Sequence, residues 1–396
     1  MEALVRKIGF YSKRSRIYFG VFILSLHNYF IVYLNSTFLQ ERGGLSDTGL
    51  SILYVISSLG VLLSFVFIEN ILRVVSNYRL CLASIAATLI GVLGMATTTN
   101  PILLSLFFII YETAIVAIYL TFDVFLESVS EKESETGGIR AIYLTIGNVI
   151  ILFAPALSGY YLDKFDQYSY IYIGASMLLV PLGALVALGF RHFPKERSHT
   201  KDFLSLIKRF YTNKNLKNVY RSDLVLMFFY AAMVIYTPLY LHEHIGFSWT
   251  DITLKIFPIM LLPFSLLEIP LGKIADKWLG EKELLMSGFV IMSVATICVA
   301  FVESTNPFVW AAVLCATRIG ASMVEIMTET YFFKHVNASD ADFILFYRTA
   351  SPVAYIVTPL LFGALLPFIG FNIMFITVGL VCFTGVIFAQ ELVDTK

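Results

Sequence analysis

The sequence predicts an all-α membrane protein with twelve transmembrane helices in two pseudo-symmetric six-helix bundles. Of its 396 residues, 58% are hydrophobic and only 14% are charged, whereas soluble domains contain about 25% charged residues. Apolar stretches recur at close spacing, and each can supply the roughly 20 helical residues that cross a hydrocarbon core. Short sequence patterns also return after 202–206 residues, which indicates that the two halves are repeats.

Twelve apolar segments follow one another, six on each side of a polar, basic stretch. They span residues 17–39, 50–68, 80–98, 102–124, 141–162, 169–190, 222–241, 252–272, 284–302, 308–332, 343–366 and 370–390. This order gives a cytoplasmic N-terminal segment (1–16), a first bundle (17–190), a linker (191–221), a second bundle (222–390) and a cytoplasmic tail (391–396). The linker, of about 30 residues, is too short for a domain, so we expect a solvated connection. Its piece FLSLIKRF offers the alternative of a short amphipathic helix on the inner leaflet.

Lys and Arg residues are divided unevenly between the two sides of the membrane. With the N-terminus inside, the outer loops keep only Arg42 and Lys164, with Lys255 near the start of the eighth segment. By the positive-inside rule, both termini are expected in the cytoplasm. We expect a multi-pass protein of a prokaryotic inner membrane, present as a monomer.

Several kinds of chemistry are excluded by the sequence. A net charge of zero argues against a nucleic-acid partner, and no G-x-x-x-x-G-K-[ST] loop is present to bind ATP. His242-Glu243-His244 lacks the spacing and the third ligand of a metal site. The four cysteines lie in or beside apolar segments, so we expect free thiols. We expect no cofactor and no metal, with a proton gradient as the driving force.

The repeat runs in the same direction in both halves. Thr99-Asn100-Pro101 and Thr305-Asn306-Pro307 open the fourth and tenth segments, 206 residues apart. The stretches 154–159 and 358–363 each contain a proline followed four residues later by a glycine, and they are 204 residues apart. Parallel repeats of six helices are related by an axis along the membrane normal, with a substrate site between the halves.

Charged residues inside the apolar segments are the strongest functional signal. The 206-residue offset pairs Glu112 with Arg318, Tyr119 with Glu325, and Asp123 with Glu329. Each set has the spacing i, i+7, i+11, which places its members on one face of a helix. A charge at mid-bilayer costs at least ~2.5–3.5 kcal/mol, so such residues should face protein or water. Glu112 lies about ten residues into its segment, roughly 15 Å deep, and His27 reaches a similar depth in the first segment.

The loop between the eighth and ninth segments carries a recognisable motif. Residues 272–282, GKIADKWLGEK, follow the pattern G-x-x-x-D-(R/K)-x-x-G-(R/K)-(R/K) with one departure, Glu281. The corresponding stretch 70–79 has lost both glycines and the aspartate. With twelve segments and a central loop, the whole chain resembles the major facilitator superfamily. The resemblance implies transport by alternating access, with segments one, four, seven and ten lining a central cavity.

Two sets of site residues follow. The resemblance would bring His27, Glu112 and Arg318 around one cavity. It would also place Arg140 opposite Asp276, so we expect an Asp276–Arg140 latch. Gly272 would let the eighth segment pack closely beside this latch. The alternative is that Asp276 is a solvated loop acid.

Glu112 is expected to take up and release a proton, with Arg318 as its counter-charge. Alternatively, Arg318 binds an anionic group of the substrate, or the two residues form a permanent ion pair. Further expectations concern the rest of the stripe. Glu325 is expected to be a second titrating group, Tyr119 to lie in the cavity, and Glu329 and Asp123 to contact water. Arg348 is expected in packing or rim pairing, and His27 lies either in the cavity or in the core as a satisfied residue.

The function predicted is therefore secondary active transport of a small organic solute, by proton-coupled efflux. Efflux is favoured because residues 155–159 are similar to the end of the antiporter signature of efflux members. The alternatives are a proton- or sodium-coupled importer, or a uniporter, of a small polar nutrient. A receptor or sensor that kept the fold without cycling is the alternative from another class. An enzyme acting on lipids would need a nucleophile or metal cluster, which the sequence lacks.

Overall fold

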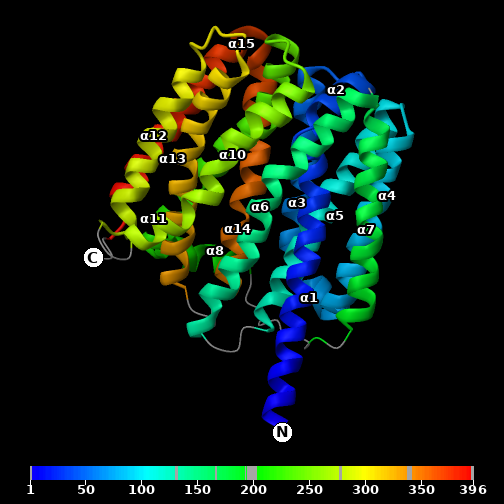
Figure 1. Cartoon of the computed structure of the whole chain (residues 1–396). Coiled ribbons are helices and arrows are strands. Elements are labelled where there is room, and N and C mark those ends of the chain that lie inside the picture. Colours follow the sequence, from blue (N-terminus) through cyan, green and yellow to red (C-terminus); the bar gives the residue numbers. More distant parts are fainter. Residues whose placement is uncertain are drawn as a thin grey trace. The chain divides into compact units, whose positions relative to one another are not determined.

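The computed structural model describes residues 2–129, 133–165, 167–191, 193, 203–275, 279–336 and 341–393. These residues form helices and turns, without a strand (Figure 1). Two compact units divide the chain: Met1–Gly44 with Leu63–Thr200, and Leu45–Leu62 with Lys201–Lys396. They are called the N-terminal unit and the C-terminal unit below.

Seven helices precede the polar linker. They are α1 (Glu2–Ile31), α2 (Asn35–Gly43), α3 (Asp47–Val74), α4 (Asn77–Thr97), α5 (Pro101–Glu127), α6 (Glu133–Phe165) and α7 (Tyr168–Gly189). In the N-terminal unit α1 packs against α6 and α7, while α4 packs against α5 and α7.

The second half repeats this order with more interruptions. It contains α8 (Phe203–Thr212), α9 (Lys214–Leu239), the π-helical turns η1 (Tyr240–His244) and η2 (Asp251–Ile256), α10 (Phe257–Leu266), α11 (Glu268–Ile274), α12 (Glu281–Val299), α13 (Pro307–Lys334), α14 (Ala341–Arg348) and α15 (Ala350–Gln390). Here α9 packs against α15, α12 packs against α13 and α15, and α10 packs against α13.

The predicted fold class is confirmed, although two crossings look different from the sequence prediction. Ten helical stretches of the described chain are long and apolar enough to cross a membrane, and α1 and α2 form an eleventh that is bent by 47°. The stretch Phe346–Gln390 contains two predicted segments. It breaks at Gly370, whose φ of 70° is not helical. Twelve crossings are consistent with this arrangement, because 45 residues of helix far exceed one bilayer.

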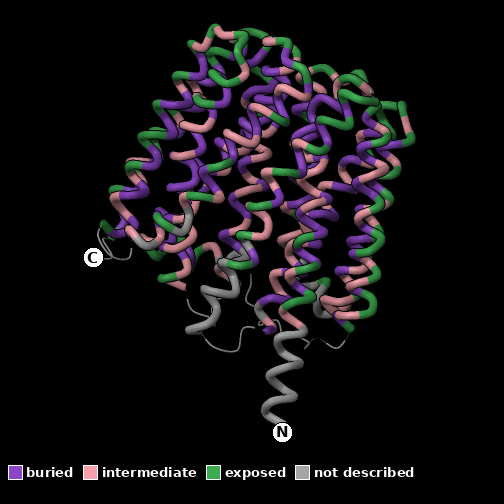
Figure 2. The backbone as a smooth tube through the Cα atoms, in the orientation of Figure 1, coloured by how far each residue is buried: buried purple, intermediate pink, exposed green. Residues whose placement is uncertain are grey.

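The outer surface of each unit is apolar. Large side chains such as Phe153, Met177 and Phe301 are 67%, 65% and 71% exposed, and exposed positions recur along the outer helices in Figure 2. A soluble protein rarely exposes so many contiguous apolar groups. Lipid is the environment that such a surface requires.

The start of α3 belongs to the C-terminal unit, although the helix continues into the N-terminal one. The Ser51 hydroxyl group lies 2.9 Å from the Tyr236 hydroxyl group, and Thr48 donates a hydrogen bond of 3.3 Å to the carbonyl oxygen of Gly363. A Cβ atom on Gly363 would collide with the side chain of Ser51. Gly363, which belongs to the repeated stretch 358–363, is thus a contact point for α3.

The linker contains a helix that docks on protein. In α8 the ring of Phe210 is completely buried and lies 4.7 Å from the Phe346 ring and 5.8 Å from the Tyr220 ring. The helix considered in the sequence is therefore present, but it packs on protein, and its position on the inner leaflet stays a prediction. Its apolar face covers α9 and α14 of the C-terminal unit.

Close packing of α12 on α13 depends on two glycines. A Cβ atom on Gly320 would lie 2.7 Å from the Gly288 carbonyl oxygen and collide with the backbone of Met292. Neither neighbour is a flexible side chain, so the helices would have to separate. This crossing fixes the rotation of α13 two residues from Arg318.

We expect Gly320→Val to destabilise the protein by about 1–3 kcal/mol or more, because overpacking at a backbone contact forces two helices apart. The matched control is Ala312→Val, on the exposed face of the same helix. Thermal unfolding of the purified proteins measures the difference. Equal melting temperatures for the two variants would show that α13 does not depend on this crossing.

Candidate functional site

The two helices that carry the charged residues begin in the same way. Asn100 caps α5 by accepting hydrogen bonds from the amides of Ile102 and Leu103, and Asn306 caps α13 by accepting one from Phe308. Proline fills the first helical position after each cap, where no amide donor is needed. Glu112 and Arg318 therefore lie equally far along their helices, at about 1.5 Å per residue.

In the N-terminal unit the polar stripe of α5 faces α1. Glu112, Tyr119 and Asp123 are all partly exposed along one side of the helix. The Tyr119 hydroxyl group makes hydrogen bonds with the side chains of Ser25 and Asn28. Tyr119 therefore has polar partners from α1 rather than from lipid.

Asn28 connects this stripe to the interior. The Tyr111 hydroxyl group donates a hydrogen bond of 3.3 Å to the Asn28 side-chain oxygen, and Tyr111 itself is 1% exposed. One amide group thus joins two tyrosines of α5, which are eight residues apart. The contact fixes the rotation of α1 against α5.

His27 is placed in the packed interior of the N-terminal unit. Its ring is completely buried, its Nδ1 atom lies 2.9 Å from the Ala175 carbonyl oxygen of α7, and Tyr111 packs edge-on against it. The other ring nitrogen, Nε2, has no hydrogen-bond partner among the described residues. The ring is therefore a core group that holds α1 on α7, although its Nε2 atom is not satisfied as the core role considered in the sequence would require.

Glu112 has a different environment. It is partly exposed in the middle of α5, and no described residue of its own unit makes a hydrogen bond or an ion pair with its carboxyl group. A carboxylate in the middle of a membrane helix needs water, a partner or a proton. Its predicted partner, Arg318, belongs to the other unit, so the Glu112–Arg318 interaction stays a prediction.

Arg318 is nearly enclosed by the C-terminal unit. It is 2% exposed, and its guanidinium carbon lies 5.0 Å from the centre of the Phe229 ring on α9. A cation over an aromatic face is stabilised by the ring quadrupole, by about 2 kcal/mol or more where water is excluded. The aromatic partner holds the charge without neutralising it.

Two further acids follow Arg318 along α13, and both have partners. Tyr230 of α9 donates a hydrogen bond of 2.7 Å to Glu325. Arg348 of α14 pairs with Glu329 at 2.6 Å. Glu329 was expected to meet water; its side chain is 20% exposed and also forms this ion pair.

A buried acid of α9 was missed in the sequence. Asp223 is 5% exposed and interacts electrostatically with Glu325, Glu329 and Arg348. It lies seven residues before Tyr230, on the same helix face, and this spacing is the signal that could have identified it.

The predicted latch falls mostly outside the described residues. Asp276 is not among them, and the side chain of Arg140 is not described either. Gly272 lies in α11, but a Cβ atom there would meet no described atom within 4 Å. The sequence predicted that the eighth segment packs closely against a neighbour at Gly272. Within the described part of the chain, this prediction is wrong.

Glu281, which departs from the loop motif, has a structural role. It is 1% exposed at the first turn of α12 and forms a salt bridge with Lys334, in the last turn of α13. An acid at a helix N-terminus and a base at a helix C-terminus also complement the two helix dipoles. The departure thus ties α12 to α13.

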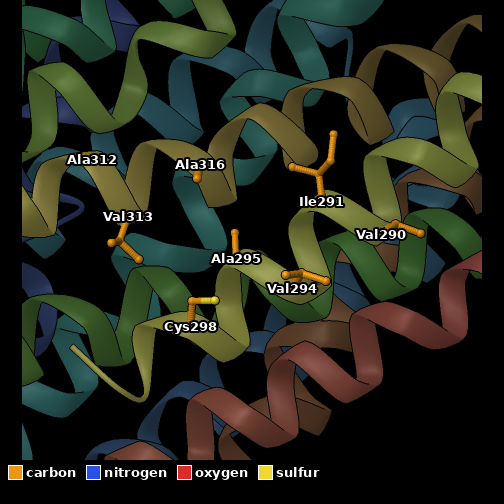
Figure 3. A pocket seen from close by; sticks show the side chains of 8 residues that line it. All are labelled: Val290, Ile291, Val294, Ala295, Cys298, Ala312, Val313 and Ala316. Carbon is orange, nitrogen blue, oxygen red and sulfur yellow. The ribbon is translucent and has the colours of Figure 1, made fainter.

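The groove between α12 and α13 is not a candidate for this polar site. It has a volume of about 580 Å³ and apolar walls, and Figure 3 shows its lining side chains on the two helices. Val294 and Cys298, which line it, are both exposed. Its chemistry suits lipid chains rather than a polar solute.

Comparison with known proteins agrees with this architecture. The sequence profile described as Major Facilitator Superfamily matches residues 17–337 and 252–393. Among solved structures, a mutant of the nucleoside transporter NupG has a TM-score of 0.73 and 14% sequence identity, over 96% of this chain and 98% of that one. No curated protein matches the sequence.

The helices and the charged stripes define a multi-pass membrane protein of the transporter class. The chain belongs to the major facilitator superfamily. Its fold is that of secondary transporters of small solutes, and this class points away from an enzyme.

We expect His27→Leu to lower thermal stability, because it removes a buried hydrogen bond that contributes about 0.5–1.5 kcal/mol. Ligand affinity of the folded protein should not change, since the ring faces α7. The control is Phe22→Leu, at an exposed position of α1. Weaker ligand binding at an unchanged melting temperature would instead place His27 in the cavity.

Proposed function

We propose that this protein exports a small organic solute in exchange for protons, and that Glu112 carries the proton. The observation that carries this proposal is Glu112, a partly exposed residue in the middle of a membrane helix, whose carboxyl group has no partner among the described residues of its own unit. Such a group changes its charge at lower cost than one held by an ion pair, because no interaction has to be broken first.

The surroundings of Glu112 supply a polar face for a solute. Tyr119, Asn28 and Ser25 are linked by hydrogen bonds on the adjacent surface of α1 and α5. Tyrosine rings and amide groups can contact an amphipathic organic molecule through both apolar and polar atoms. The stripe would then bind solute and proton close together, so that each affects the affinity for the other.

Arg318 is assigned as the fixed positive charge of the second half. Its guanidinium carbon lies 5.0 Å from the centre of the Phe229 ring, so an aromatic face supports the charge. The same charge can favour the ionised form of Glu112 in one state of the transport cycle, or attract an anionic group of the solute.

Export is favoured by the Pro155-to-Gly159 sequence in α6, which is similar to the antiporter signature. Import is the alternative, and one comparison bears on it. NupG is a nucleoside transporter, so nucleosides belong among the first solutes to be tested. A coupled importer, a uniporter or a non-cycling receptor of this fold would each bind a solute as well.

The solute can be found by thermal-shift screening of the purified protein with drugs, nucleosides, sugars, amino acids and organic anions. A ligand at a hundred times its dissociation constant stabilises the fold by about 2.7 kcal/mol. Hits then enter flux assays in proteoliposomes. Binding without flux would favour the receptor alternative.

We expect Glu112→Gln to abolish accumulation driven by a pH gradient and to preserve solute exchange at equal pH, because the amide cannot carry a proton. Both are measured in proteoliposomes with the solute found by screening. Glu303→Gln, in an exposed loop, is the control. Undiminished gradient-driven accumulation in Glu112→Gln would end the proposed role of this residue.

A further inference from the structure

Four cations lie at the beginning of the C-terminal unit's helices, where α8 leads into α9. They are Lys208 of α8 and Lys214, Lys217 and Arg221 of α9, and all four are exposed or partly exposed. None of their side chains forms an ion pair or a hydrogen bond with a described residue. The three residues of α9 have the spacing i, i+3, i+7, which places them on one side of the helix. These four residues are called the basic face below.

Acids are scarce beside the basic face. The stretch 203–222 contains no Asp or Glu residue, and Asp223 is buried. At the other end of the unit's sequence, the exposed Glu391 accepts a hydrogen bond of 3.1 Å from the Asn218 side chain. Within the described stretches 203–222 and 371–393, one exposed carboxylate therefore stands against four cations. This surface carries net positive charge, which favours an anionic partner.

Packing holds the basic face in place. The buried Phe210 ring anchors α8 against α9 and α14. Tyr331 of α13 donates a hydrogen bond of 3.0 Å to the Val393 carbonyl oxygen, and the Val393 amide donates one of 3.3 Å to the Asn215 side chain. The start of α9, the end of α13 and the end of α15 are thus held together. The cations belong to packed helices rather than to a free loop.

Arg221 joins this charge to the membrane-facing surface. Its guanidinium carbon lies 5.5 Å from the centre of the Phe388 ring. Arg221 directly precedes the apolar segment 222–241, and Phe388 lies two residues before the end of α15. The pair therefore lies where hydrocarbon gives way to polar headgroups, a zone in which aromatic rings and long cationic side chains are common.

An apolar stripe runs along α15 up to this pair. Its members are Ile373, Leu380, Phe383 and Ile387, all of which are exposed. Their spacing of seven, three and four residues keeps them on one side of the helix, over a length of about 21 Å at 1.5 Å per residue. Ile387 is followed directly by Phe388. An anionic phospholipid has the complementary form, with a charged phosphate at the end of apolar chains.

Signals for membrane orientation would not by themselves produce this arrangement. The positive-inside rule requires cations in the loops of the inner side, and any position in such a loop would serve. It does not require an arginine to pack on an aromatic ring, or an apolar stripe to end beside that ring. A soluble anion would use the cations but would leave the stripe unused.

We propose that the basic face and the apolar stripe of α15 form a binding site for an anionic phospholipid of the inner leaflet, the side to which the positive-inside rule assigns the chain termini. The phosphate accepts hydrogen bonds from the Arg221 guanidinium group, which can donate two in parallel. Lys214 and Lys217 add attraction for the negative charge of the headgroup. One acyl chain lies along the stripe, so the lipid contacts α9 and α15 together.

This site is independent of the proposed export mechanism. All of its residues belong to the C-terminal unit, and none is a member of the charged stripes of α5 and α13. Lipid binding can therefore be measured without the solute, and failure of one proposal does not imply failure of the other.

Native mass spectrometry of the full-length protein in mild detergent tests the site, because it counts the lipids that remain bound. The probes are phosphatidylglycerol and phosphatidylcholine with identical acyl chains, which differ in net charge. We expect the wild-type protein to bind phosphatidylglycerol more tightly than phosphatidylcholine. The preference should weaken at high salt, because exposed charges are screened.

Variants locate the bound lipid. Arg221→Gln should weaken phosphatidylglycerol binding about fivefold, the factor that one cation near an anionic headgroup contributes. Arg221→Lys should have a smaller effect, because the charge remains while the planar two-bond contact is lost. Arg79→Gln, at an exposed position of α4, is the matched control and should bind lipid as the wild type does.

A double variant gives a second test that leaves Arg221 and its ring contact intact. Lys214→Gln combined with Lys217→Gln should weaken phosphatidylglycerol binding roughly 25-fold, as two such cations are removed. Melting temperatures measured without added lipid show that each variant is folded. If Arg221→Gln does not fold, the double variant decides.

Three results would overturn the proposal. Equal affinity of the wild-type protein for the two lipids would show that the site does not select an anionic headgroup. Unchanged phosphatidylglycerol binding in the folded variants of the basic face would place the lipid elsewhere. Displacement of the bound lipid by excess inorganic phosphate would show a site for soluble anions, since phosphate cannot occupy the stripe.

Discussion

A charge inside hydrocarbon must be paired, neutralised or hydrated, and this constraint organises the polar residues of the protein. Of the charged groups along α13, Arg318 lies over an aromatic ring, Glu325 accepts a tyrosine hydrogen bond and Glu329 holds an arginine. Each solution uses a residue from another helix of the same unit. The charges therefore also set which helix faces meet.

The identical beginnings of α5 and α13 place Glu112 and Arg318 equally far along their helices. In each helix an asparagine cap and a following proline fix the first turn, and the helical rise then determines where Glu112 and Arg318 fall. The glycines at the crossing of α12 and α13 fix the rotation of α13 as well.

Much of the fold could be predicted from the sequence, because membrane crossing imposes a simple length and composition rule. The twelve segments, the capped starts of α5 and α13, and the charged stripe at i, i+7, i+11 all follow from local pattern. The break that bends α1 against α2 and the merging of two segments in α15 were not apparent. Both occur within continuous apolar sequence, where hydropathy carries no signal for a kink.

The partners of the charged residues could not be predicted from the sequence. That Arg318 meets Phe229 and Arg348 meets Glu329 depends on how helices rotate against one another. Asp223 was missed because it lies near the end of the apolar segment 222–241. Helix α9 begins nine residues before Asp223, so this acid is well inside the helix. Gly272 shows the opposite error, since its motif suggested a close contact that the described structure lacks.

Proton exchange for solute is the central claim, and simultaneous recording of both fluxes tests it most directly. Weakly buffered proteoliposomes carrying the wild-type protein would be loaded with the solute, and solute release and external pH would be followed together without any imposed gradient. Coupled antiport predicts that protons enter as solute leaves, so the medium becomes alkaline. Solute release without a pH change would contradict the account and assign the protein as a uniporter.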